Sequence, residues 1–107
     1  MRVLTQDYSP ITGGFASITV DATAGGTAIT LPTGVLLNTV SMVLITCESF
    51  PCRYTLDTVA PTALIGHLFT PGMYLMLANR QSINNFRAFR TTGDSAVLKV
   101  TFFGGGR

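Results

Sequence analysis

Charged residues are scarce in this 107-residue sequence: they make up 11% of it, whereas hydrophobic residues make up 47%. Soluble domains ordinarily carry about 25% charged residues. A chain this short also has a high ratio of surface to volume, which calls for more polar surface rather than less. The sequence therefore predicts that something other than its own core covers part of its apolar surface. A membrane, further copies of the chain, or a larger assembly would each do so.

Long hydrophobic runs are missing as well. The longest apolar stretches, Val43–Ile45 and Met73–Ala78, fall far short of the ~20 residues that a membrane-spanning helix needs. Polar residues follow the first apolar residues at once, so no signal peptide is expected, and we expect synthesis in a cytoplasm without export. Nucleic-acid binding needs a basic cluster, whereas the net charge is only +2 and the basic residues are scattered. Neither a membrane nor a nucleic acid is therefore an expected partner.

Strong helix formers are also few, with one Glu, one Lys and two Gln, while Thr, Val, Ile, Leu, Phe and Gly dominate. This composition is typical of β-structure. Apolar and polar residues alternate in Phe15–Val20, and inward and outward positions alternate in Ala96–Phe103. Turn signals such as Gly13-Gly14, Gly25-Gly26 and Pro71-Gly72 separate these runs at short spacing.

The pattern predicts an all-β fold, a jelly-roll-like β-sandwich of about eight antiparallel strands. We expect one sandwich domain at residues 15–103, preceded by an N-terminal arm or first strand at 1–14 and followed by a flexible Gly-rich tail at 104–107. The stretch Arg80–Phe86 has room for one helical turn. The expected strands span residues 2–5, 14–21, 26–31, 39–47, 52–57, 63–68, 73–78 with a continuation near 86–91, and 95–103.

Two of the expected strands, 39–47 and 73–78, have no polar face. An antiparallel sheet in an isolated sandwich normally keeps one face in water. These strands would therefore be either central strands covered by a loop or short helix, or strands whose outer faces contact other subunits. We favour the second interpretation, because large apolar patches usually mark contacts.

Catalytic and metal-binding patterns are absent from the sequence. The five carboxylates show no pairing, and the single histidine, His67, has no Cys, Asp or Glu beside it, so we expect neither a metal site nor a general base. No nucleophile, phosphate-binding or dinucleotide-binding motif occurs. We therefore expect a non-enzymatic protein without a cofactor.

The two cysteines, Cys47 and Cys52, flank a short loop between two expected strands. Residues opposite each other in a β-ladder are close enough for a disulfide, with Cα atoms about 5.5 Å apart. Two buried free thiols are the alternative, because proteins made in a cytoplasm rarely carry disulfides. The sequence leaves both open.

Three segments carry a resemblance to a known family. They read R-Y-x-x-D at Arg53–Asp57, P-T-x-x-x-G-H at Pro61–His67 and N-F-R-x-x-R at Asn85–Arg90, and the strand Ala96–Phe103 follows them. With this pattern, residues 40–103 resemble a family of small virion proteins of tailed bacteriophages. The resemblance implies a structural component of the phage particle and leaves its position in the particle open.

The resemblance and the scarcity of charge lead to one functional hypothesis. We expect a head decoration (cement) protein in the virion, a homo-oligomer with a trimer favoured, which binds the major capsid protein. A tail, neck or fibre-base component is the alternative, and a carbohydrate-binding sandwich ranks below both. Because Arg and aromatic residues are enriched at interface hot spots, we expect assembly contacts at Arg53, Tyr54, Arg87, Phe89 and Arg90. Each of these residues would also fit within the sandwich.

Overall fold

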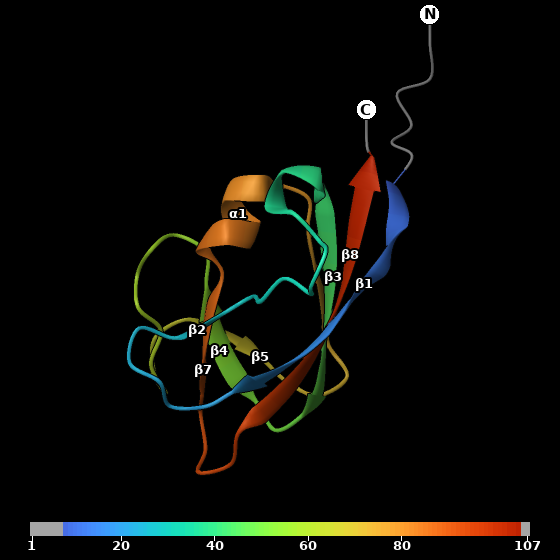
Figure 1. Cartoon of the computed structure of the whole chain (residues 1–107). Coiled ribbons are helices and arrows are strands. Elements are labelled where there is room, and N and C mark those ends of the chain that lie inside the picture. Colours follow the sequence, from blue (N-terminus) through green and yellow to red (C-terminus); the bar gives the residue numbers. More distant parts are fainter. Residues whose placement is uncertain (1–7, 106–107) are drawn as a thin grey trace, which may run out of the picture.

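Two antiparallel sheets of four strands each pack face to face in the computed structural model, which describes residues 8–105 (Figure 1). A short α-helix and a 3-10 turn lie at one end of this sandwich. The elements, in chain order, are β1 (Tyr8–Val20), β2 (Thr27–Ala28), η1 (Leu37–Thr39), β3 (Met42–Ser49), β4 (Cys52–Thr55), β5 (His67–Phe69), β6 (Tyr74–Leu77), α1 (Arg80–Asn85), β7 (Arg87–Arg90) and β8 (Ala96–Gly105). The predicted all-β sandwich is confirmed.

The strand order identifies the topology. One sheet has the order β1-β8-β3-β6 and the other the order β2-β7-β4-β5. The first strand thus pairs with the last, the second with the seventh, the third with the sixth and the fourth with the fifth. This nested pairing, folded over into two sheets, is the connectivity of a jelly roll.

Strand alternation places the core between the two sheets. Every second residue of β8 from Ala96 to Phe102 is fully buried, and Ile45 and Cys47 of β3 face the same interior. The other sheet contributes Cys52 and Ala88, and Phe86, which follows α1, is buried in the same core. The core is therefore continuous across both sheets.

The helical turn predicted for residues 80–86 is α1. Asn79 begins it, because its side-chain oxygen accepts hydrogen bonds from the backbone N–H groups of Gln81 (2.8 Å) and Ser82 (3.2 Å). Ile83 is the buried residue of the helix and fixes it against the sandwich. By crossing from β6 to β7, α1 carries the chain from one sheet to the other, so residues 73–78 and 86–91 do not form one continuous strand.

Several predicted boundaries differ from the structure. β1 begins at Tyr8, so residues 8–14 belong to this strand, whereas residues 1–7 of the predicted arm lie outside the described residues, as does the expected strand 2–5. The pair Gly13-Gly14, which signals a turn in the sequence, forms a bulge within β1, between Pro10 and Phe15. β8 extends through Gly105, so Gly104 and Gly105 are strand residues and not part of a flexible tail.

Candidate interaction surfaces

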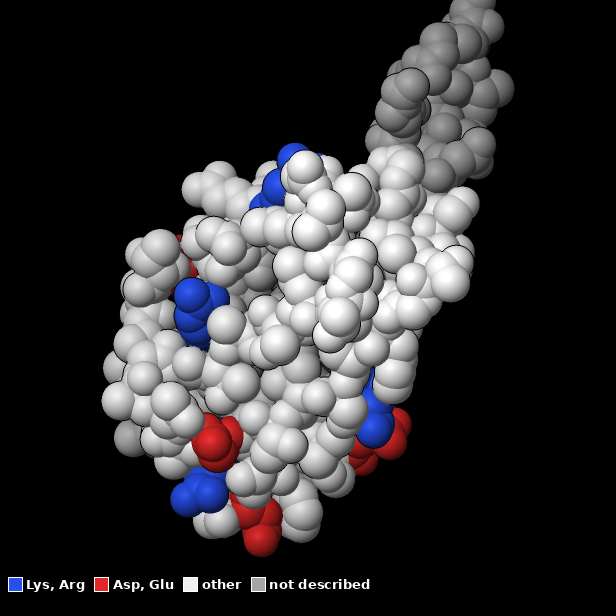
Figure 2. All heavy atoms as spheres, in the orientation of Figure 1, with Lys and Arg blue, Asp and Glu red and all other residues white. Residues whose placement is uncertain are grey.

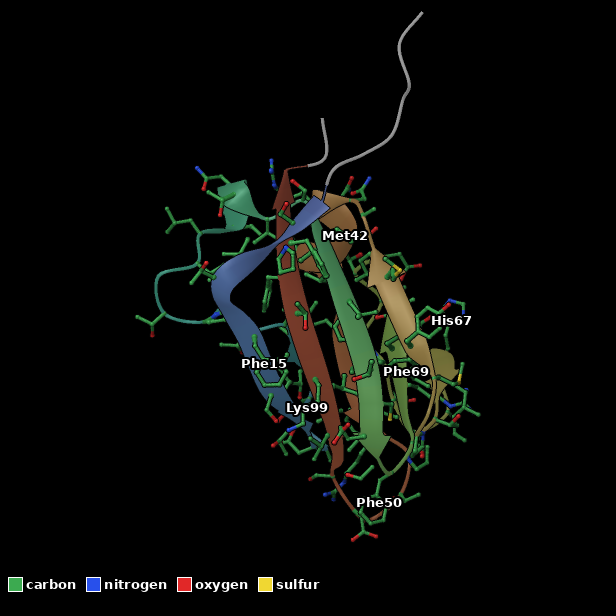
Figure 3. The ribbon with its side chains drawn as sticks, turned by 90° about the vertical axis from the view of Figure 1, so that its right-hand side faces the viewer. Phe15, Met42, Phe50, His67, Phe69 and Lys99 are labelled. Carbon is green, nitrogen blue, oxygen red and sulfur yellow. The ribbon has the colours of Figure 1, made fainter. Side chains whose placement is uncertain are left out.

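The first candidate surface is the outward face of the sheet β1-β8-β3-β6, here called the outer sheet face. Cross-strand pairing places its side chains in rows, one of which runs Phe15, Thr101, Leu44 and Met76 across the four strands. The adjacent row runs Ser17, Lys99, Thr46 and Tyr74. Figure 3 shows this face, with Phe15 on β1 next to Lys99 on β8.

Large apolar side chains of the outer sheet face are open to solvent. Phe15 is 56% exposed, Tyr74 69% and Met76 51%. The charged residues at its outward positions are Lys99, near its middle, and Glu48, at the bulge that ends β3. Charged side chains are similarly sparse over the face of the molecule seen in Figure 2, where most of the surface is uncharged. No helix or loop of the described chain lies over this sheet face (Figure 3).

The second candidate surface lies on the opposite side of the sandwich, where the loop from Leu56 to Gly66 folds back over the sheet β2-β7-β4-β5. Arg53 holds this loop, because its Nε donates to the carbonyl of Ala63 (3.1 Å) and its Nη1 to the carbonyl of Gly66 (3.0 Å). The buried hydroxyl of Thr55 donates to the carbonyl of Val59 (2.5 Å). The loop is thus fixed by side chains of β4.

This fixed loop presents apolar side chains outward. Leu64 is 86% exposed, and Val59 and Ile65 are each about half exposed. Between the loop and β5 lies an open groove of about 400 Å³, here called the loop groove, lined by Thr55, Leu56, Asp57, Val59, Ile65, Gly66 and His67. Asp57 is the carboxylate of this lining, and its oxygen accepts a long hydrogen bond from the backbone N–H of Val59 (3.4 Å).

Three of the five predicted contact residues lie together on the outward side of the sheet β2-β7-β4-β5. Arg53 pairs with Phe89, and Arg87 lies one row further along, opposite Thr55. Both arginines donate to backbone carbonyls of their own chain, Arg87 to those of Asn84 (3.0 Å) and Phe86 (2.7 Å). Their guanidinium groups therefore already serve the fold.

The other two predicted contact residues are placed differently. Tyr54 points into the sandwich, where its ring stacks on Phe86 and meets Phe69 edge to face. Burial raises the pKa of its hydroxyl. Arg90 lies at the end of β7, and its backbone N–H donates to the carbonyl of Asp21 (3.1 Å). Tyr54 is thus partly buried and packs against the core.

The two cysteines are free thiols in the structure. Cys47 lies in β3 and Cys52 in β4, so they belong to different sheets, and both are buried. Burial raises the pKa of both thiols, that of Cys52 to about 12. The thiolate, which is the reactive form, is therefore strongly disfavoured at neutral pH.

The described residues contain no group of three or more His, Cys, Asp or Glu side chains placed to hold a metal ion. His67 is exposed on β5 and lies against the Tyr54 ring, with 5.3 Å between ring centroids. None of the helices in residues 8–105 has the length and apolarity needed to cross a bilayer.

Comparison with known proteins adds no relative. No protein-family model matches the chain, and neither a curated protein nor a solved structure shows significant similarity to it. The resemblance of residues 40–103 to phage virion proteins therefore stays a prediction.

Proposed function

We propose that this protein is a structural component of a tailed-bacteriophage particle, and within it a head decoration protein that self-associates and binds the outer surface of the capsid. The observation that carries the proposal is the outer sheet face, which exposes Phe15, Tyr74 and Met76 around few charges. Exposed apolar patches of this kind ordinarily mark contact sites in soluble proteins.

A second observation supports an assembly role. The fixed loop on the other side of the sandwich exposes Val59, Leu64 and Ile65. One small domain therefore offers two separate apolar surfaces, as a subunit of a repeating assembly needs when it contacts more than one neighbour. In a lattice, many such contacts act together, so each can be weak while the assembly as a whole is stable. A closed ring, with a trimer favoured, would cover these surfaces.

The test is quantitative protein stoichiometry of the purified particle, by mass spectrometry with isotope-labelled peptides. A decoration protein should approach the copy number of the major capsid protein. A copy number far below it would place the protein in the tail, neck or fibre base instead. Absence of the chain from the particle would contradict the proposal altogether.

A binding experiment addresses the mechanism. Tyr74→Asp should greatly reduce binding to particles that lack the protein, because it puts a charge in the outer sheet face. Thr92→Asp is the matched control, since Thr92 is exposed in the β7–β8 loop, outside both surfaces. Equal binding of the two variants would contradict a role for the outer sheet face.

A further inference from the structure

The outer sheet face and the loop groove lie on opposite sides of the sandwich. This arrangement affects which type of contact between copies of the chain can cover both surfaces. A two-fold contact joins the same patch on both copies, so it would cover only one of the two surfaces. A head-to-tail contact joins the first surface of one copy to the second surface of the next, so one type of interface covers both.

On the outer sheet face, a cation and an aromatic ring form one unit. The Lys99 Nζ donates to the hydroxyl of Ser17 (3.1 Å) and lies 6.0 Å from the centroid of the Phe15 ring. Its ammonium group thus leans toward β1 and away from Glu48, which lies on the other side of β8, on β3. The result is a half-exposed phenyl ring at the sheet edge with a positive charge beside it (Figure 3).

The loop groove is complementary to Phe15 and Lys99, because it has apolar walls and a negative charge. Val59 and Ile65 give it apolar walls, and Asp57 gives it a negative charge. Its volume of about 400 Å³ is more than ten times the ~30 Å³ that one water molecule occupies in the liquid, so it has room for an aromatic side chain. A protruding apolar group that enters a groove elsewhere on the next copy makes a head-to-tail contact.

We propose that Phe15 of one copy enters the loop groove of a second copy of this chain, with Lys99 of the first paired to Asp57 of the second. This inference rests on the proposed function, and it specifies how the subunits contact each other. The charge pair sets the orientation of the contact, and burial of the phenyl ring supplies its affinity.

Sedimentation velocity of the full chain over a range of concentrations tests the charge pair. Lys99→Glu and Asp57→Lys should each weaken self-association by about tenfold, because each places like charges opposite one another. The double variant restores an opposite-charge pair and should return to within about threefold of the original affinity. A double variant no stronger than the weaker single variant would overturn the pairing.

A mixing experiment tests the head-to-tail arrangement. Phe15→Asp damages only the protruding side and Val59→Arg only the groove, so each variant alone should be monomeric. Their mixture keeps one intact contact and should form a 1:1 dimer and nothing larger. Phe50→Asp is the matched control: Phe50 is 46% exposed and lies in the β3–β4 loop, outside the contact, so its self-association should equal that of the original chain. Thermal unfolding of each variant checks that it remains folded.

Different results would contradict the inference and the proposed function. If Val59→Arg associates normally while Phe15→Asp does not, the outer sheet face joins to itself and the inference is wrong. If the original chain stays monomeric at every concentration, the inference is also wrong, yet the proposed function survives when the chain is abundant in purified particles. Absence from those particles would remove the proposed function even if the chain self-associates.

Discussion

Arg53 can be interpreted in two ways. Its residue type predicts a subunit contact, whereas its hydrogen bonds make it an internal support for the loop groove. Replacing it by Met keeps the aliphatic packing and removes both hydrogen bonds, to Ala63 and Gly66. A hydrogen bond to a charged group contributes about 1.5–3 kcal/mol. Because Arg53 is only half-buried, solvent competes for its guanidinium group, so we expect the two bonds together to contribute about 2 kcal/mol.

Urea unfolding followed by circular dichroism measures this loss. With a urea dependence of about 2 kcal/mol per molar, the midpoint of Arg53→Met should fall by about 1 M. Amide hydrogen exchange should also accelerate at Leu64 and Ile65, whose N–H groups donate to the Thr62 hydroxyl within the loop. Arg80→Met is the matched control, because exposed Arg80 also donates to backbone carbonyls, those of Asn38 and Val40, and its loss should cost less than about 1 kcal/mol.

One result would refute the reasoning. If Arg53→Met and Arg80→Met unfold at the same urea concentration and exchange in the loop is unchanged, the Arg53 guanidinium does not support the loop. The groove would then hold its shape without Arg53, whose side chain would be available to a partner, as its residue type predicts.

Two further predictions concern the core and the cysteines. Leu98→Ala removes a fully buried side chain from the centre of β8 and should lower the free energy of unfolding by about 2–5 kcal/mol in urea titrations; a loss below about 1 kcal/mol would contradict tight packing there. Cys52 should resist alkylation at pH 8 in the native protein and react after denaturation, since burial raises its pKa from 9.0 to about 12. Because the pKa of this thiol is higher in the folded state, the stability that it contributes is intact below pH 9 and is lost between pH 9 and about pH 12. Over this range, the urea midpoint of Cys52→Ala should therefore fall less than that of the original chain.

The regular strands of the fold were predictable because their local pattern and their tertiary environment agree. The alternation of Phe15–Val20 and of Ala96–Phe103 is the alternation of burial in β1 and β8. Gly13-Gly14 was wrong as a turn signal, because the conformational freedom of glycine suits a bulge as well as a turn. Gly13 has a φ of +74°, and a Cβ on Gly14 would lie 2.8 Å from the carbonyl oxygen of Ile11. Local sequence does not distinguish the two uses.

The surfaces were predictable only in part. The absence of a polar face in residues 73–78 correctly indicated that apolar side chains would remain outward, as Tyr74 and Met76 do. The loop groove had no such signal, because it depends on hydrogen bonds from Arg53 to residues more than nine positions away. Tyr54 was an interface candidate by residue type, yet its inward position depends on the pairing of β4 with β7, which sequence alone does not specify.

The pairing of β1 with β8 has a consequence for synthesis in the cell. Val20 pairs with Ala96 and Tyr8 with Gly105, so the first strand finds its partner only after the last has left the ribosome. At about 5–20 residues per second, the intervening 75 to 96 residues take roughly 4–20 s to translate. During this interval the inward side chains of β1, Ile18 and Val20 among them, are open to neighbouring nascent chains. A copy that accepts a neighbour's β1 would make the same pairings, so crowded translation favours strand-exchanged products, and slow, dilute expression favours the fold in which β1 pairs with β8 of its own chain.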